Sequence, residues 1–324
     1  MKVRQFAEGS DISQPLLVRE AQIRRRRDGT EFLRVRLGDR TGTVSAVIEE
    51  DIAAMRELYS PGEVVHVTGT VTIHPRFGPE LAIAAVRAAG ASEYVRAELQ
   101  DGPVRPPEKL EADLRELIAT VQDPWLRRLL TAVFGEHAPT WTSFRDAPAA
   151  KHYHQAYRHG LLEHSLTVGQ AVGAISATFP GIDRDVAVTG ALLHDIGKLE
   201  AYDMEDGAIE MSDLGRLYGE IPLGYYRVRR LIDELEGFPA ELERALLHII
   251  LSHHGTLEHG SPVVPVTREA TLVHMIDNLG GRLGSFDRLE KELRSGEAWS
   301  AWDKGIGGGA YFGPRADTER AAAA

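Results

Sequence analysis

The residues best suited to chemistry are a histidine and an aspartate, His194 and Asp195, that stand side by side at the end of an apolar helical pattern. Val188, Leu192 and Asp195 fall at i, i+4 and i+7, so the carboxylate lies on the stripe that should face the core. A buried acid without a partner is costly, and a metal ion is the simplest partner that fixes an imidazole and a carboxylate together. The alternative is a helix end where His194 and Lys198 complement the dipole and Asp195 is at the surface.

Further histidines and an aspartate recur at helical spacing in the second half of the chain. Ten of the 13 histidines lie between positions 152 and 274. His164, His253 and Asp277 each stand three or four residues from apolar positions of a predicted helix. With His194 and Asp195 they bring five polar groups to the inward faces of four helices, which one ion site explains better than separate buried polar groups.

The available donor atoms limit which metal such a site would take. The chain contains no cysteine, so disulfides and thiolate ligands are excluded, and histidine, carboxylate or water must hold the ion. Imidazole and carboxylate ligands favour Mn²⁺, Fe²⁺ or Mg²⁺ over a structural zinc ion. We therefore predict a divalent metal as the cofactor.

Length and composition indicate a folded protein of two domains. The chain has 324 residues, of which 43% are hydrophobic and 26% charged. The net charge of −11 argues against a generally basic nucleic-acid binder, yet residues 1–98 are neutral, with 14 basic and 14 acidic residues. No apolar run approaches membrane-spanning length and the first residues lack the apolar region of a signal peptide, so we expect a cytoplasmic protein without a membrane partner.

The first part of the chain predicts a small barrel. Strands are predicted over residues 16–27, 32–37, 43–48, 64–74 and 81–86, with a short helix over 52–58. Three strands, a helix and two strands in this order are typical of an OB-fold, a five-stranded Greek-key barrel that often binds single-stranded nucleic acid. We therefore predict an OB-fold domain that binds single strands over residues 1–98.

A basic run and a few aromatic residues are the candidates for contacting nucleic acid in this barrel. They are Arg24, Arg25, Arg26, Arg27, Phe32, Arg76 and Phe77. Aromatic rings stack on bases and arginines contact phosphates in such barrels. The alternative is that the basic run is an exposed charged hairpin end, that Phe32 belongs to the core and that Phe77 caps the barrel.

The remaining chain reads as a linker, a helical domain and a tail. Glycine and proline mark residues 99–108 as a linker. Residues 109–304 are helical in period throughout, with Asp123 and Pro124 as a helix-start signal, which predicts an all-α domain. Residues 305–324 are glycine-rich and then alanine-rich, and the last of them are expected to be mobile.

The order His164, His194-Asp195, Asp277 resembles the signature of the HD superfamily of metal-dependent phosphohydrolases, in which those residues bind a divalent metal. Longer phrases resemble the YhaM-type 3′-to-5′ exoribonucleases, which also join an N-terminal OB-fold to an HD domain. These phrases are residues 147–151 (APAAK), 154–158 (HQAYR), 160–164 (GLLEH), 193–198 (LHDIGK), 252–255 (SHHG) and 274–279 (HMIDNL). The resemblance covers about residues 13–300 and implies Mn²⁺ as the metal.

Two positions depart from the family pattern. His159 replaces the first glycine of the family phrase Gly-Gly-Leu-Leu-Glu-His, which changes little. Glu220, in residues 215–220 (GRLYGE), stands where dinuclear HD enzymes place a further ligand histidine. The number of ions, one or two per chain, is therefore open at this stage.

The resemblance and the residue pattern together suggest a role for each site residue. Asp195 is expected to bridge two ions, with the other ligands distributed between them: His164, His194, Glu220, His253 and Asp277. Lys198 and Arg158 are the candidates for holding phosphates, and the alternatives are a helix cap and an ordinary surface residue. His254 or His154 is the candidate for protonating the departing 3′ oxygen.

The predicted function is a metal-dependent 3′-to-5′ exoribonuclease that hydrolyses single-stranded RNA to nucleoside 5′-monophosphates. The first alternative is an HD-type phosphohydrolase of nucleotides or cyclic dinucleotides. The second is a non-catalytic nucleic-acid-binding adaptor whose HD site is only structural. Cleavage of single-stranded DNA and assembly into a homo-oligomer are left open by the sequence.

Overall fold

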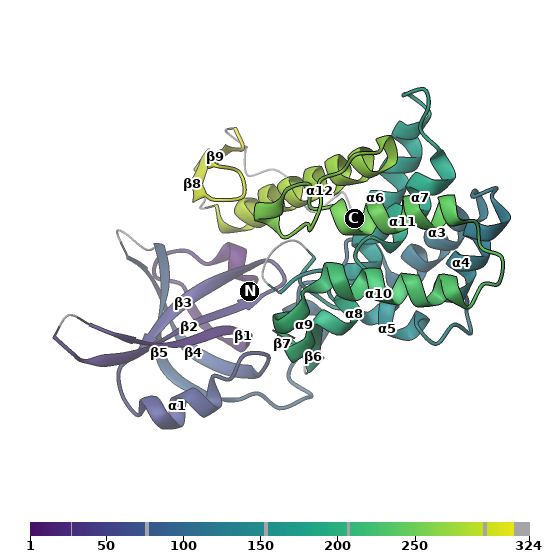
Figure 1. Cartoon of the computed structure of the whole chain (residues 1–324). Helices are drawn as coiled ribbons and strands as arrows, with labels where there is room; N and C mark the ends of the chain where they lie inside the picture. The colour runs from purple at the N-terminus through teal and green to yellow at the C-terminus, as the bar shows by residue number, and fades with distance from the viewer. Residues whose placement is uncertain (27, 75–77, 152–154, 206–207, 294–296, 314–324) are drawn as a thin grey trace.

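The chain folds into an N-terminal barrel and a larger helical domain (Figure 1). The computed structural model describes residues 1–26, 28–74, 78–151, 155–205, 208–293 and 297–313. The prediction of a five-stranded OB-fold barrel followed by a helical domain is confirmed by this architecture. Within the described ranges, no helix has both the length and the apolar character needed to cross a membrane.

The barrel is closed by five strands in the order β1-β2-β3-β5-β4, with β4 pairing back onto β1. Its elements are β1 (Asp11–Arg25), β2 (Glu31–Asp39), β3 (Gly42–Ile48), α1 (Ile52–Leu58), β4 (Val64–His74) and β5 (Gly78–Ala88). The β3–β5 pair is parallel and the others are antiparallel. Closure leaves no long open edge, which protects the strands from pairing with other chains.

Alternation along the strands decides which side chains fill the barrel. In β2 the side chains of Leu33, Val35 and Leu37 are fully buried, whereas Arg34 and Arg36 between them face outward. Successive side chains of a strand point to opposite faces, so this spacing places one set in the core and the other on the surface. The outward set of β2 is therefore basic.

The stretch predicted as a linker is attached to the barrel. The short helix α2 (Arg96–Leu99) places Leu99 against Leu17 and Val64. Arg19 donates from Nη2 to the Leu99 carbonyl at 2.8 Å, and its Nη1 lies 3.3 Å from Asp101 Oδ2. These contacts hold the start of the connection in one position.

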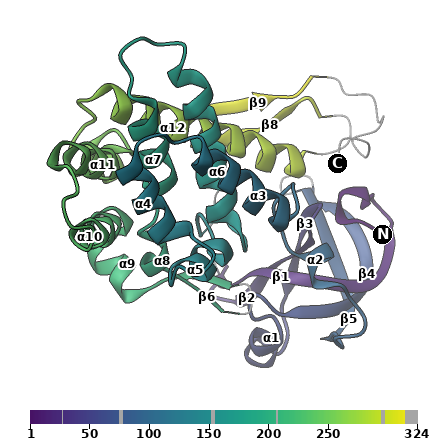
Figure 2. The same ribbon diagram turned by 90° about the vertical axis from the view of Figure 1, so that its right-hand side faces the viewer.

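The helical domain is organised around one buried helix. Its helices are α3 (Pro107–Ala119), α4 (Pro124–Phe134), α5 (Trp141–Asp146), α6 (Gly160–Ser176), α7 (Arg184–Leu193), α8 (Lys198–Ala201), α9 (Asp213–Tyr218), α10 (Glu220–Asp233), α11 (Ala240–Ser252) and α12 (Arg268–Glu292). All residues of α7 from Val186 to Leu193 are buried, and α7 contacts α4, α6, α11 and α12 (Figure 2). Whatever lies at the end of α7 is therefore surrounded by the other helices.

Two small hairpins interrupt the helical domain, a feature that the helical period did not predict. They are formed by β6 (Tyr202–Glu205) with β7 (Ala208–Met211), and by β8 (Trp299–Asp303) with β9 (Gly308–Tyr311). These strands are too short to show a recognisable alternation of apolar and polar residues in the sequence. The predicted boundary at residue 304 falls in the β8–β9 turn, where Asp303 Oδ1 accepts hydrogen bonds from the amides of Gly305 and Ile306.

The two domains have separate hydrophobic cores. None of the four tryptophans lies in the barrel: Trp125 and Trp141 stand on α4 and α5, and Trp299 and Trp302 stand on β8. Replacing Leu33→Ala in the barrel should therefore lower the free energy of unfolding of the barrel by about 2–5 kcal/mol, through lost burial and the cavity left behind. In urea titrations the circular-dichroism transition of the barrel should shift, while the tryptophan fluorescence transition stays in place. Leu130→Ala in α4 is the matched control and should shift the fluorescence transition; coincident shifts in both variants would contradict the separation of the cores.

Candidate metal centre

The five side chains predicted as inward-facing polar groups meet at one point of the helical domain. His164 comes from α6, His194 and Asp195 from the turn after α7, His253 from the end of α11 and Asp277 from α12. These helices contact one another in the order α6, α7, α11, α12, and α12 returns to α6. The packing of the domain thus brings together residues that are more than a hundred positions apart.

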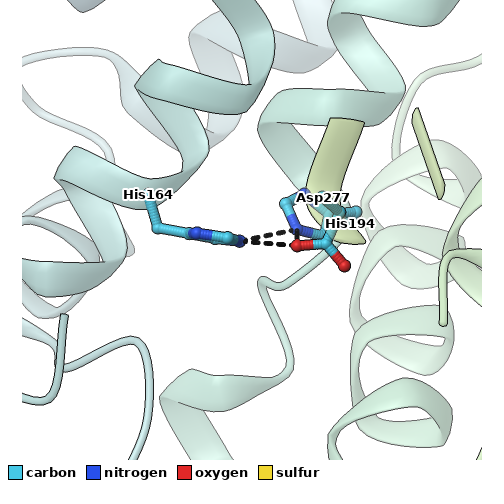
Figure 3. Close-up of side chains that lie close together, drawn as sticks. All are labelled: His164, His194 and Asp277. Carbon is cyan, nitrogen blue, oxygen red and sulfur yellow. Dashed lines mark hydrogen bonds and ion pairs between the residues drawn. The ribbon is translucent and has the colours of Figure 1, made fainter. Parts of the chain in front are cut away.

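The first group of donor atoms consists of two imidazoles and one carboxylate that point toward one another (Figure 3). His164 Nε2 lies 3.1 Å from His194 Nε2 and 3.1 Å from Asp277 Oδ1. His194 Nε2 lies 3.8 Å from Asp277 Oδ1. One oxygen and two nitrogens at these separations are placed to bind one metal ion together.

A second group of donor atoms adjoins the first and consists of Asp195, His253 and His254. His253 Nε2 lies 3.5 Å from Asp195 Oδ1, and His254 Nε2 lies 3.6 Å from Glu220 Oε1. Asp195 Oδ2 also lies 3.2 Å from His164 Nε2 in the first group. Asp195 therefore stands between the two groups, where a bridging carboxylate would stand.

Backbone carbonyl groups orient three of the imidazoles toward the centre. The Nδ1 atoms of His194, His253 and His254 lie 2.6, 2.8 and 2.9 Å from the carbonyl oxygens of Ala191, Ile250 and His259. A carbonyl oxygen only accepts, so each Nδ1 donates its proton outward. In the neutral ring this leaves the lone pair on Nε2, which points inward and can bind a metal ion.

Two buried atoms of this centre have no hydrogen-bond partner among the described residues, namely Asp195 Oδ1 and His253 Nε2. Both residues are at most 1% exposed. A buried polar atom without a partner is destabilising, and a divalent ion between these two atoms would satisfy both at once. The donor set of carboxylates and imidazoles therefore fits a divalent metal.

The charges of the centre depend on one another. Burial raises the pKa of Asp195, but Lys198 and His194 outweigh it and hold this pKa well below its usual value; His164 and His194 do the same for Asp277. Burial lowers the pKa of His194, yet the two carboxylates outweigh this and raise it to about 10. At neutral pH both carboxylates are thus ionised and His194 holds a proton at the place where a metal would bind.

Gly197 allows α10 to approach the turn that carries His194 and Asp195. A Cβ atom on Gly197 would lie 1.9 Å from the Glu220 carbonyl oxygen and 2.4 Å from the Gly224 amide nitrogen. Only glycine permits this contact of backbones. The contact positions Glu220, the first residue of α10, beside His254.

The residues predicted to bind phosphates and the histidines predicted to protonate the departing 3′ oxygen lie in different surroundings. Lys198 Nζ lies 2.6 Å from Asp195 Oδ2 and so belongs to the centre. Arg158 instead donates to Asp146 Oδ2 at 2.6 Å, and its side chain is 60% exposed. His254, predicted as an acid, lies among the ligand atoms of the second group, and burial and the neighbouring His253 lower its pKa. Its role as an acid stays a prediction. His154 lies outside the described residues.

The predicted nucleic-acid contacts at the end of the β1–β2 hairpin form a network of their own. Arg24 donates to Gln22 at 2.9 Å, Arg25 pairs with Glu31 at 2.7 Å, and Arg26 pairs with Glu49. The Arg26 guanidinium stands 5.4 Å above the ring of Phe32, which is partly exposed and so is not a core residue. Arg27, Arg76 and Phe77 lie outside the described residues.

Sequence reasoning did not find the groups that orient the ligands. The carbonyl groups are backbone atoms and leave no signal in residue types. Gln155, whose Oε1 lies 3.0 Å from His164 Nδ1, is part of the phrase at residues 154–158, but nothing in its type or spacing indicated this contact. These partners fix the ring orientation of the ligands and so form part of the centre.

Comparisons with known proteins agree with the two domains. Residues 161–281 match the model of the HD domain family, and residues 19–87 match that of an OB-fold nucleic acid binding domain. The chain is similar to the 3′-5′ exoribonuclease YhaM of Bacillus subtilis, with 29% identity over 293 residues, which covers 89% of this chain and 90% of that protein. It is also 28% identical over 299 residues to the 3′-5′ exoribonuclease YhaM of Shouchella clausii, covering 91% of each.

Because the proton on His194 competes with the ion, binding of Mn²⁺ to the metal-free protein should release about one proton near neutral pH. Its pKa of about 10 means that the proton is held below that pH, so the apparent affinity should rise with pH. We expect up to about a tenfold rise per pH unit between about pH 6 and 8. Titration calorimetry in buffers of different ionisation enthalpy measures the release.

The exposed His137→Ala variant is the control and should release protons like the unmodified chain. Metal uptake with no proton release, or with an affinity that does not change with pH, would contradict this assignment of charge.

Proposed function

We propose that this chain, a homologue of the YhaM 3′-5′ exoribonucleases that carries an OB-fold and an HD domain, is a metal-dependent 3′-5′ exoribonuclease acting on single-stranded RNA. The observation that carries the proposal is the pair of adjoining donor groups with Asp195 between them. A phosphodiester needs charge neutralisation on its oxygens and an activated water, and an array of this kind is suited to supply both.

The chain's own residues divide this work. His164, His194, Asp195 and Asp277 would hold one ion, and Asp195, Glu220, His253 and His254 would hold a second. Bound there, divalent ions supply Lewis acidity, which lowers the pKa of water and stabilises charge on the phosphoryl oxygens. Lys198 adds a buried cation beside Asp195, and its ammonium group is placed to bind a phosphate oxygen once the carboxylate is shared with an ion.

The proposal also covers the identity of the metal, the reaction products, the cellular compartment and the oligomeric state. We propose Mn²⁺ as the ion, since the centre offers only imidazole and carboxylate donors. The products are nucleoside 5′-monophosphates released one at a time from the 3′ end, in the cytoplasm. Single-stranded DNA is proposed as a weaker substrate, and a homo-oligomer as the form in solution.

The test is to incubate the purified chain with Mn²⁺ and, in separate reactions, 5′-labelled single-stranded RNA, a cyclic dinucleotide and nucleoside triphosphates. A ladder of RNA products that shortens from the 3′ end supports the proposal. Hydrolysis confined to the cyclic dinucleotide or the triphosphates would replace it with a nucleotide phosphohydrolase. Binding of RNA with no hydrolysis of any substrate would replace it with an adaptor.

Asp195→Ala and His194→Ala should each lower RNA hydrolysis by more than about 100-fold, since loss even of groups that only support metal ligands costs 10–100-fold. Binding of RNA by the barrel should be retained, and a cooperative unfolding transition in tryptophan fluorescence reports that the helical domain of each variant is folded. Asp233→Ala on α10, whose side chain is 56% exposed, is the matched loss of a carboxylate outside the centre. Turnover near that of the unmodified chain in either variant would overturn the assignment.

Glu220→Ala should lower activity by about 10-fold or more and raise the Mn²⁺ concentration needed, because Glu220 is proposed as a ligand of a more weakly held second ion. The competing role for Glu220 is a first-turn acid that stabilises the dipole of α10. Glu241→Ala removes a first-turn acid of α11 far from the donor atoms and separates the two roles.

The decisive measurement is metal content together with activity. Two ions per chain in active protein, with a selective effect of Glu220→Ala, supports the dinuclear centre. One ion per fully active chain and equal, small effects of the two variants would show that Glu220 only stabilises its helix.

A further inference from the structure

We propose that the RNA strand upstream of the metal centre lies in a groove shared by both domains, between the barrel and the C-terminal end of α12. This inference rests on the proposed function, because it concerns the strand whose 3′ end the centre hydrolyses. In Figures 1 and 2 the end of α12 lies over the side of the barrel near β3. The groove between them has a volume of about 730 Å³.

The groove is strongly basic in a chain whose net charge is −11. Its charged lining consists of five cations and one carboxylate, namely Arg4, Arg24, Arg34, Arg36, Lys291 and Glu20. A concave surface of one sign concentrates ions of the opposite sign. The acidic surface elsewhere repels a polyanion, so this groove is the favoured place for one to bind.

Strand geometry places Arg34 and Arg36 in one row on the outer face of β2. Arg34 pairs across the ladder with Gln22, and Arg36 pairs with Glu20 on β1 and with Ser45 on β3. Arg34 and Arg36 are two residues apart, so their Cα atoms are about 7 Å apart along the strand. Neighbouring arginines at this spacing can contact different phosphates of one strand, and Phe32 continues the same face of β2.

The helical domain completes the groove with Lys291 and Leu293. Lys291 stands on the same helix as Asp277, fourteen residues further along α12. At about 1.5 Å per residue, the groove therefore begins about 21 Å from the metal ligand. A stacked strand advances about 3.4 Å per nucleotide, so the groove would be reached from about the sixth nucleotide counted from the 3′ end.

The present partners of these cations are easily exchanged for phosphates. Arg36 Nη1 lies 3.8 Å from Glu20 Oε1, and Arg36 Nη2 donates to Thr43 Oγ1 at 3.0 Å. Lys291 Nζ lies 3.3 Å from Asp101 Oδ1. The four charged side chains of these ion pairs are at least 36% exposed. Exposed ion pairs of this kind contribute little to stability, so their loss on binding costs little.

The experiment measures binding of phosphorothioate-linked RNA strands of about four and about twelve nucleotides, chosen to fall short of the groove and to fill it. Resistant strands need no turnover, so the result is independent of whether the chain hydrolyses RNA. The test variant is Arg36→Gln with Lys291→Gln in the full chain with Mn²⁺. The matched control is Arg56→Gln with Arg230→Gln, two exposed arginines on α1 and α10.

The test variant should bind the long strand at least about tenfold more weakly. The slope of the logarithm of its binding constant against the logarithm of the salt concentration should become shallower by about 0.7 for each lost phosphate contact. Binding of the short strand and the behaviour of the control should match the unmodified chain. Lys291→Arg alone keeps a cation at this position, so this variant should bind the long strand almost as tightly as the unmodified chain.

Three results would overturn the inference. The first is unchanged affinity and salt dependence for the long strand. The second is equal weakening of both strands, which would place the effect at the metal centre. The third is competition by polyglutamate as strong as that by unlabelled RNA, which would identify an acidic peptide as the partner.

Discussion

Two adjacent carboxylates inside the helical domain are the constraint on which the rest of this structure depends. Asp195 is fully buried and the side chain of Asp277 is 17% exposed. Both are held ionised, and such groups are tolerated only with compensating positive charge. His194 and Lys198 supply that charge from the protein, and a divalent ion would supply more of it. The central helix α7 is buried along its length because it must deliver His194 and Asp195 to this point.

The backbone does much of the positioning around these charges. Carbonyl groups three residues back along the chain turn His194 and His253 inward, and the carbonyl of His259 does the same for His254. Gly197 lets α10 approach closely enough for Glu220 to lie beside His254. Ligand identity is thus a matter of side chains, whereas ligand direction is decided by helix ends and turns.

The sequence was most informative where a regular period coincides with burial. The alternation around Leu33 predicted β2. The helical spacing of His164 and Asp277 predicted that both point inward; His164 is buried, and Asp277, 17% exposed, lies 3.1 Å from it. The β8–β9 hairpin was missed because its strands are too short to carry a period. The sequence could not place His254 or His154 relative to the departing 3′ oxygen, and the structure brings His254 to the second donor group. The groove between the barrel and α12 could not be predicted from the sequence, because Lys291 reaches the barrel only through tertiary packing.

The separate hydrophobic cores have a consequence for how the chain would hold a long substrate. Each domain has a hydrophobic core of its own, and the contacts of Arg19 with Leu99 and Asp101 set where the second begins relative to the first. If the proposed groove and metal centre both hold the strand, they would act as a bivalent binder, in which the second contact is made at a high effective concentration once the first has formed. A strand released from one site would then be recaptured before it diffuses away, and successive cleavages would become events within a single encounter.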